Sequence, residues 1–251
     1  MKGMIFAAGL GTRLRPLTDT TPKALIEVEG TPLLEHIITK LRAFGLDGLI
    51  INVHHHAQQI IDFVRARGDF GMEIVFSHEP DLLSTGGGLK QAGWFLRDSD
   101  PFLLHNVDVL TDLPLADMLQ QHRQRAPLAS IAVRQRDTQR YFLFDESLQL
   151  CGWESLQSGE KRIAREGAGT LQRLSFMGIH IISPRIFSLF EESGRFSIVD
   201  VYLRLAAAGE SIIGYRDDHS RWLDLGRMEN FHNARRILGD DFFDTSSHSV
   251  E

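Results

Sequence analysis

The feature that most constrains this chain is a regular alternation of short apolar runs with stretches of helical periodicity. The apolar runs, which predict buried strands, lie at 4–8, 49–53, 73–76, 102–105 and 129–133. Between them, apolar residues recur every three or four positions, as on one face of a helix, at 33–44, 57–67, 88–96 and 115–124. Strands that alternate with helices in this way predict a mainly parallel sheet covered by helices on both faces.

Local signals set the bounds of the first predicted helix. Thr31 is expected to cap its N-terminus, and Pro32 suits its first position because the N–H that proline lacks has no partner there. Gly45 is expected to end the helix, since glycine readily adopts the left-handed conformation found after helix C-termini.

The pattern changes near residue 134. Two strands are predicted around the turn at 145–147, followed by a polar loop at 158–170 and then by six further elements. These expectations are strands at 141–144, 148–153, 174–182, 211–215 and 221–225, and helices at 184–192, 198–208 and 229–238. We therefore expect one α/β domain over 1–238 with a small β-rich elaboration, and a polar tail at 239–251 whose composition is typical of disorder.

Composition excludes several classes of protein. With 27 basic and 33 acidic residues the formal net charge is −6, which disfavours broad binding to nucleic acid or to anionic membranes. No apolar run approaches the roughly 20 residues of a membrane-spanning helix, and the first residues lack the features of a signal peptide. The only cysteine, Cys151, cannot form an intramolecular disulfide, so we expect a cytoplasmic protein and no catalytic role for this thiol.

A Gly-rich loop, Gly9-Leu-Gly-Thr-Arg13, directly follows the first apolar run. Glycines there let backbone N–H groups approach phosphate oxygens, and Arg13, Arg15 and Lys23 add positive charge within a short stretch. A Gly-x-Gly pair by itself is more often an ordinary turn. The loop has neither the spacing of a P-loop nor the third glycine of a dinucleotide fingerprint, which disfavours a dinucleotide-dependent oxidoreductase.

The longer string resembles a known family signature. Gly9-x-Gly-Thr-Arg-Leu-x-Pro-Leu-Thr18, followed by Pro22-Lys23, is similar to the signature of sugar-1-phosphate nucleotidylyltransferases. The resemblance implies a Rossmann-like α/β fold and transfer of a nucleotidyl group from a nucleoside triphosphate (NTP) to a sugar 1-phosphate, with release of pyrophosphate. It implies that the residues binding the triphosphate or stabilising its charge include Ala8, Gly9, Gly11, Thr12, Arg13 and Lys23, with Arg13 and Lys23 catalytic.

Two aspartates are candidates for binding Mg²⁺. Either one alone is more often a turn or helix-capping residue. However, Asn106-Val-Asp108 resembles the Asn-Gly-Asp segment of the family, and Trp222-Leu-Asp-Leu-Gly226 resembles its late Trp-x-Asp-x-Gly segment. The resemblance implies that Asp108 and Asp224 hold Mg²⁺ and that Asp108 is catalytic. Val107 departs from the common glycine, and we expect it to shift the backbone or to narrow the sugar pocket.

Further segments resemble the base and sugar pockets of the family. One of them is the Gly-rich loop Leu83-Ser-Thr-Gly-Gly-Gly-Leu89. The resemblance implies that Thr85, Gly86 and Gly87 contact the nucleobase, with Glu79 nearby. The alternative interpretation is that this loop is only a flexible helix start. Phe176-Met-Gly-Ile-His180, Ser197-Ile-Val-Asp200 and Glu160-Lys161 resemble sugar-side segments. They imply sugar-phosphate contacts by Gly178, Asp200 and Lys161, although capping of a helix is an equally good interpretation of Asp200.

Three consecutive histidines, His54 to His56, do not predict a metal site, because neighbouring residues on a strand point to opposite faces. Within the family, the chain most resembles N-acetylmuramate-1-phosphate uridylyltransferases and mannose-1-phosphate guanylyltransferase-like proteins. We expect uridylyl transfer, with guanylyl transfer or a glucose-1-phosphate thymidylyl- or uridylyltransferase as alternatives. A non-catalytic nucleotide-sugar-binding protein is disfavoured, because such proteins usually lose the Arg, Lys or Asp residues that are present here. The sequence leaves the oligomeric state open.

Overall fold

The computed structural model describes residues 1–226 and 228–243. Its centre is a ten-stranded sheet. The strands are β1 (Lys2–Phe6), β4 (Gly48–Val53), β5 (Glu73–His78), β6 (Phe102–Asn106), β8 (Ala129–Arg134), β9 (Arg140–Phe144), β10 (Leu150–Ser155), β11 (Lys161–Ile163), β12 (Gln172–Ile182) and β13 (Ile212–Arg216). They follow the order β11-β10-β9-β12-β6-β1-β4-β5, with β8 pairing β12 and β13 pairing β8.

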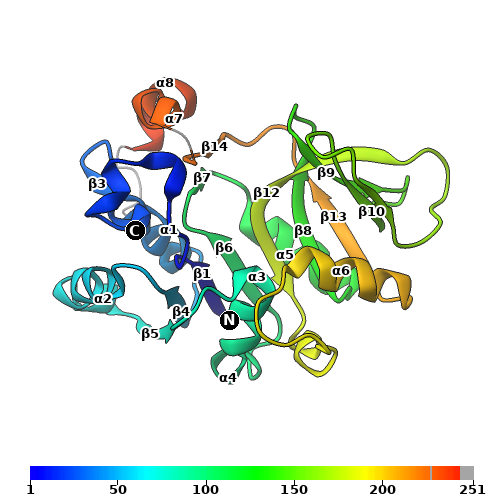
Figure 1. Ribbon diagram of the computed structural model, residues 1–251, viewed down its shortest axis with the longest axis horizontal. Helices are drawn as coiled ribbons and strands as arrows, with labels where there is room; N and C mark the ends of the chain where they lie inside the picture. The colour runs from blue at the N-terminus through cyan, green and yellow to red at the C-terminus, as the bar shows by residue number, and fades with distance from the viewer. Residues whose placement is uncertain (227, 244–251) are drawn as a thin grey trace.

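The sheet is mixed. β1 pairs in parallel with β4 and with β6, and β4 pairs in parallel with β5. β12 runs antiparallel to β6, β8 and β9, and β10 runs antiparallel to its two neighbours, β9 and β11. In Figure 1 the parallel strands β1, β4 and β5 lie on one side of β6, and the β-rich second half lies on the other. The predicted Rossmann-like α/β fold with a β-rich elaboration is confirmed.

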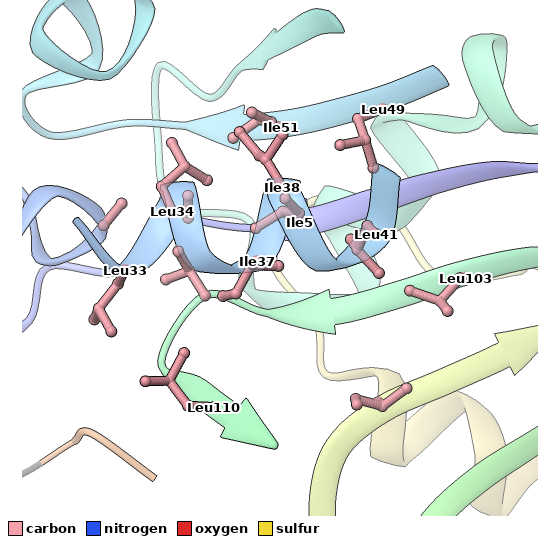
Figure 2. Close-up of a cluster of buried hydrophobic side chains, with 14 of the residues drawn as sticks. Ile5, Leu33, Leu34, Ile37, Ile38, Leu41, Leu49, Ile51, Leu103 and Leu110 are labelled. Atoms are coloured by element: carbon pink, nitrogen blue, oxygen red, sulfur yellow. The ribbon is translucent and has the colours of Figure 1, made fainter. Parts of the chain in front are cut away.

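Helices cover both faces of the sheet, as predicted. The helices are α1 (Leu33–Ala43), α2 (Ala57–Ala66), α3 (Ser84–Gln91), α4 (Gly93–Leu96), α5 (Leu115–Arg125), α6 (Ile198–Ala207), α7 (Met228–His232) and α8 (Ala234–Leu238). Buried side chains of α1, α2, α5 and α8 belong to one apolar cluster, and those of α3, α4 and α6 belong to a second. Figure 2 shows Leu34, Ile37 and Ile38 of α1 beside Ile5 and Ile51 of the sheet.

Two short strand pairs lie outside the large sheet. β2 (Glu27–Val28) pairs with β3 (Thr31–Pro32) in a hairpin just before α1. β7 (Val109–Thr111) pairs with β14 (Trp222–Asp224), which joins a segment near the middle of the chain to one near its end. Figure 1 shows this second pair between the two halves of the molecule.

Several local predictions were wrong. Thr31 does not cap α1, because its backbone pairs in the β2–β3 hairpin, and Pro32 precedes the helix rather than beginning it. The loop predicted at 158–170 contains β11, because residues 161–163 find backbone partners on β10. The helix predicted at 184–192 is a 3₁₀ turn over Pro184–Ser188.

Towards the C-terminus the agreement is partial. The helix predicted at 229–238 is divided into α7 and α8, which meet at Asn233. The predicted tail begins with a 3₁₀ turn over Asp240–Phe242, and its remainder from 244 to 251 lies outside the described residues. No helix described in the structure is long and apolar enough to cross a membrane.

The strand order places a ligand crevice at a defined point. The chain leaves β1 through α1 to reach β4 on one side of β1, and it returns from β5 through α3 and α4 to reach β6 on the other side. The loops that follow β1 and β6 therefore diverge at the carboxyl ends of two neighbouring parallel strands. This switch point is where open α/β sheets bind their ligands.

Candidate active site

A cavity of about 360 Å³ opens at the carboxyl ends of β1 and β6. Residues predicted for nucleotide binding and catalysis that line it are Ala8, Gly9, Gly11, Thr12, Arg13, Lys23, Glu79, Thr85 and Asp108. The remaining lining residues are Phe6, Leu14, Asn52, Leu82, Ser84, Asn106, Val107 and Gly226. The fold thus gathers the Gly-rich loop and one predicted metal ligand around a single space.

The Gly-rich loop turns sharply at Gly11. The φ angle of this residue is 61°, a left-handed conformation in which glycine is favoured. Its carbonyl accepts a hydrogen bond from Oγ1 of Thr18 at 2.9 Å and another from the N–H of Leu14 at 2.8 Å. A Cβ at this position would lie 2.8 Å from Cγ2 of Thr18. Thr18 therefore fixes the loop from behind, and a side chain at position 11 would displace it.

A buried polar chain holds the start of this loop. Oδ1 of Asn52 accepts a hydrogen bond from the N–H of Ala7 at 2.7 Å, and Nδ2 of Asn52 donates to Oε1 of Glu79 at 2.7 Å. The second oxygen of Glu79 accepts from the N–H of Leu83 at 2.9 Å. Glu79 is only 1% exposed. The carboxylate predicted near the base therefore ties the Gly-rich loop to the loop that precedes α3.

Lys23 and Asp108 form an ion pair at the floor of the cavity. Nζ of Lys23 lies 2.5 Å from Oδ2 of Asp108, and the two side chains are 10% and 24% exposed. Lys23 comes from the 3₁₀ turn Lys23–Leu25, whereas Asp108 lies in the two-residue link between β6 and β7. The structure thus brings together two predicted catalytic residues that are 85 positions apart.

Asp224 reaches the same place through the β7–β14 pair. It lies opposite Val109 in the register, and the N–H of Leu225 donates to the carbonyl of Asp108 at 2.8 Å. One carboxylate oxygen of Asp224 accepts from the N–H of Gly226 at 2.7 Å. The two predicted metal ligands are therefore held next to each other by backbone hydrogen bonds.

Arg13 lies against the same turn. A Cβ at Gly226 would lie 2.7 Å from a terminal nitrogen of Arg13 and 2.8 Å from Oδ1 of Asp224. The glycine thus allows the guanidinium to approach the Asp224 turn. Arg13 is exposed and forms no ion pair with a described residue. Its donors are available to an anion that enters the cavity.

The donor set fits a magnesium ion that is shared with phosphate. In the described part of the chain, Oδ1 of Asp108 and Oδ2 of Asp224 accept no hydrogen bond, so each carboxylate keeps one oxygen for a cation. No group of three or more His, Cys, Asp or Glu side chains among these residues could hold a metal by itself. Mg²⁺ is commonly bound by one or two carboxylates together with substrate phosphates and water, and Asp108 with Asp224 match this requirement.

Val107, which departs from the family pattern, does not displace the backbone from the sheet. Its N–H donates to the carbonyl of Phe6 on β1 at 3.2 Å. The side chain is buried in the apolar cluster on the α1 face and also contributes to the cavity wall.

Two glycines predicted to contact the base are not among the residues that line the cavity. The N–H groups of Gly86 and Gly87 both donate to the carbonyl of Phe196, and a Cβ on Gly87 would lie 2.4 Å from the carbonyl of Gly194. These glycines allow α3 to pack closely against the segment before α6. Thr85 does line the cavity, and its Oγ1 accepts from the N–H of Ile198 at 3.0 Å.

The predicted sugar-side residues are not all brought together. Gly178, with a φ of 85°, packs against Val109 and Asn106 beside the cavity. Asp200 lies in the first turn of α6 and pairs with Arg162 at 2.6 Å. Lys161 is directed to a different hollow, which is lined by Gln135, Leu143, Leu171, Gln172 and Arg173. The structure therefore places Arg162, not Lys161, next to Asp200.

Groups with strongly shifted pKa values do not line the cavity. Burial lowers the pKa of His105 and of His122 to about 4, and that of His180 to about 3. Of the three consecutive histidines, His54 places Nδ1 2.7 Å from the carbonyl oxygen of Glu79, and none of them belongs to a metal cluster among the described residues.

Sequence reasoning missed several residues of the site. Asn52 lies within an apolar strand. A polar amide inside such a run was the only sequence signal for a buried polar role. Thr18 belongs to the family signature, but the signature does not indicate that its side chain holds the Gly-rich loop. Nothing in the sequence separated Gly226, which admits Arg13, from an ordinary turn glycine.

The chain is similar to known proteins over nearly its whole length. The family model described as nucleotidyl transferase matches residues 2–240. An N-acetylmuramate alpha-1-phosphate uridylyltransferase from Caulobacter vibrioides is 35% identical over 236 residues, covering 89% of this chain and 90% of that protein. A mannose-1-phosphate guanyltransferase from Yarrowia lipolytica is 29% identical over 234 residues. That match covers 92% of this chain, which spans only 62% of the length of the Yarrowia protein.

A solved structure supports the fold. The crystal structure of HddC from Yersinia pseudotuberculosis aligns with a TM-score of 0.76 at 20% identity, covering 94% of this chain and 98% of that one. Because the family model spans nearly the whole described chain, and the Caulobacter relative matches over almost its full length, this chain belongs to the nucleotidyl transferase family.

Proposed function

We propose that this protein transfers a nucleotidyl group from an NTP to a sugar 1-phosphate and releases pyrophosphate. The observation that carries the proposal is the convergence of Arg13, Lys23, Asp108 and Asp224 beside one Gly-rich loop at the switch point of the sheet. Two cations and two carboxylates in such a cavity suit a reaction between two anionic phosphates. The family membership supports the same reaction class.

In the proposed reaction, an oxygen of the sugar phosphate attacks the α-phosphorus of the NTP. The bond between the α-phosphorus and the oxygen bridging to the β-phosphate breaks, and pyrophosphate leaves with that oxygen. The attacking phosphate is already ionised, so no side chain has to remove a proton. Arg13, free of ion pairs to described residues, is suited to bind the triphosphate, and Lys23 is suited to bind phosphate next to Asp108.

Asp108 and Asp224 would hold Mg²⁺. When bound, the ion neutralises charge on the reacting phosphates. The contribution of the chain itself is to hold the two carboxylates together through the β7–β14 pair and to orient Asp108 through Lys23. Backbone N–H groups at Gly9 to Arg13, in a loop kept open by glycine, are suited to bind the triphosphate.

For the substrates, we infer uridylyl transfer to N-acetylmuramate 1-phosphate or a related amino-sugar 1-phosphate. The support is the Caulobacter uridylyltransferase, which matches over 90% of its own length, whereas the Yarrowia guanyltransferase matches over 62%. Guanylyl transfer to mannose 1-phosphate is the alternative that the second relative favours. A reducing cytoplasm is the setting that we expect for a chain with one cysteine.

The test is a matrix of UTP, GTP, dTTP, CTP and ATP against glucose, mannose, N-acetylglucosamine and N-acetylmuramate 1-phosphates, scored by Mg²⁺-dependent pyrophosphate release. We expect one pair to react well, and Asp108→Ala to lower its turnover by about 10³-fold or more. Asp98→Ala is the matched control, since Asp98 is exposed just beyond the end of α4. Absence of pyrophosphate with every pair, or near-normal turnover by Asp108→Ala, would overturn the proposal and favour a non-catalytic nucleotide-sugar-binding protein.

A further inference from the structure

One arginine near the site differs from the other half-buried arginines. Arg136 lies in the link between β8 and β9 and has neither a hydrogen bond nor an ion pair to any residue that the structure describes. The five other half-buried arginines all bind carbonyl or carboxylate oxygens: they are Arg134, Arg162, Arg165, Arg204 and Arg221. A guanidinium that is partly removed from water and has no protein partner is well suited to bind an anionic ligand.

The guanidinium of Arg136 is held in place by an aromatic surface. Its central carbon lies 4.3 Å from the centre of the Trp222 ring, a cation–π contact. Nε1 of Trp222 in turn donates to the carbonyl of Met177 at 2.8 Å, which fixes the indole on β12. Nε of Arg136 is buried and has no partner among the described residues. The side chain is therefore oriented in advance, although no protein acceptor occupies its donors.

Trp222 places this cation beside one of the two proposed metal ligands. Trp222 and Asp224 are two residues apart on β14, so both side chains project from the same face of the strand. Burial lowers the pKa of Arg136, and the charge of the nearby Asp224 partly opposes this lowering. On the far side of Asp224 along the chain, Arg13 lies against Gly226. Two arginines without ion pairs to described residues thus flank one proposed metal ligand.

The sugar side of the site lies next to Arg136. Met177, which holds Trp222, directly precedes Gly178, and Gly178 packs on Asn106 and Val109 at the edge of the cavity. The cations of β11 are engaged elsewhere. Lys161 faces another hollow, and Arg162 is paired with Asp200 and with Glu160. Arg13, proposed to bind the triphosphate, lies on one side of Asp224. Arg136 is therefore the cation best placed to bind a second phosphate on the other side.

We propose that Arg136, stacked on Trp222, binds the phosphate of the sugar 1-phosphate and orients it for attack. The inference rests on the proposed function, and it assigns to Arg136 the role that the sequence suggested for Lys161. A planar guanidinium can bind two oxygens of a phosphate at once, which fixes the direction of the third. The second substrate is thereby defined as a phosphate monoester, recognised through its phosphate whatever the sugar.

The test compares Arg136→Met, Arg136→Lys and the control Arg140→Met with the wild type. Arg140 is exposed at the start of β9, only four positions along the chain, and its replacement removes the same charge. Each protein is assayed with the best NTP and sugar 1-phosphate pair from the matrix above, varying one substrate at a time. We expect Arg136→Met to raise the KM for the sugar 1-phosphate by about 10- to 100-fold and to leave the KM for the NTP within about twofold.

Two further results are expected. Arg136→Lys should restore part of the loss, because a lysine keeps the charge but not the paired donors. Arg140→Met should match the wild type. If Arg136→Met changed both KM values equally, or only lowered the melting temperature, Arg136 would serve to pack Trp222 and the inference would be wrong. If the wild type used no pair at all, the proposed function would fail first and the inference with it.

Discussion

Replacing Asn52 with leucine should reveal how much the buried polar chain behind the Gly-rich loop contributes. The two side chains have the same number and branching of heavy atoms, and leucine is the larger, so the change removes hydrogen bonds without opening a cavity. It deprives the N–H of Ala7 of its acceptor at 2.7 Å and Oε1 of Glu79 of its donor at 2.7 Å. Each buried group left unsatisfied costs about 1–3 kcal/mol, and we take about 4 kcal/mol for the pair because Glu79 is a carboxyl.

For a chain of this length, about 4 kcal/mol corresponds to a fall in melting temperature of about 8–16 °C. Circular dichroism on heating measures this fall, with Gln58→Leu as a control that removes only a surface hydrogen bond to Asp62. The KM for the NTP should rise as well, because Asn52 holds the start of the Gly-rich loop. A melting temperature within about 2 °C of the wild type, with an unchanged KM, would refute this account.

A second variant at this position gives a pH-dependent signature. In Asn52→Asp, a carboxyl group faces Glu79 where the amide now donates, so one of the two must hold a proton in the folded state and its pKa is raised. A carboxyl group whose pKa is raised by folding stabilises the folded state at low pH. That stabilisation is lost as the pH rises through the pKa of the group in the folded state. The deficit of Asn52→Asp relative to the wild type should therefore grow from about pH 5 to about pH 8.

Three further predictions concern other residues. Lys23→Met should lower kcat by about 10²- to 10³-fold, because it removes charge at the reacting phosphates, while circular dichroism shows an unchanged fold; a loss below about tenfold would contradict its role. Gly178→Ala should cost about 1–3 kcal/mol in urea unfolding, since φ is 85° and a Cβ would lie 2.6 Å from Cγ2 of Val109; unchanged stability would contradict the strain. Burial lowers the pKa of Lys40 to about 8, so above that pH the unfolded protein binds more protons than the folded protein. The unfolding free energy of the wild type should therefore rise relative to that of Lys40→Met between about pH 8 and about pH 10. The same pH dependence of the unfolding free energy in both proteins, measured with urea, would contradict this.

The parallel part of the fold could be predicted because burial leaves a strong pattern. The strands at 49–53 and 102–105 are continuous apolar runs, and α1 carries its apolar residues at helical spacing. These signals depend only on near neighbours in the chain. β11 gives no such signal, because its residues are mostly exposed and it exists only through pairing with β10.

The site was predictable where short motifs carry the chemistry. The Gly-rich loop, Lys23 and Asp108 meet in one cavity, as the family resemblance implies. Lys161 was predicted, with Asp200, to contact the sugar phosphate, but the residue that lies next to Asp200 is Arg162. Neighbouring residues on a strand face opposite ways, and a segment predicted as a loop gives no basis for choosing between Lys161 and Arg162.

Gly86 and Gly87 show a second limit. A Gly-rich helix start is equally compatible with contact to a flat base and with contact to another backbone segment. The contact seen in the structure is to the carbonyl of Phe196, which is more than 100 positions away and leaves no local trace in the sequence.

The most direct test of the central claim follows the oxygen atoms of the reaction. Sugar 1-phosphate labelled with ¹⁸O throughout its phosphate is incubated with unlabelled NTP and Mg²⁺, and both products are analysed by mass spectrometry. Attack of the sugar phosphate on the α-phosphorus predicts that every labelled oxygen remains in the nucleotide sugar and that the pyrophosphate is unlabelled. Label in the pyrophosphate, or pyrophosphate formed without any nucleotide sugar, would contradict nucleotidyl transfer at the cavity lined by Arg13, Lys23 and Asp108.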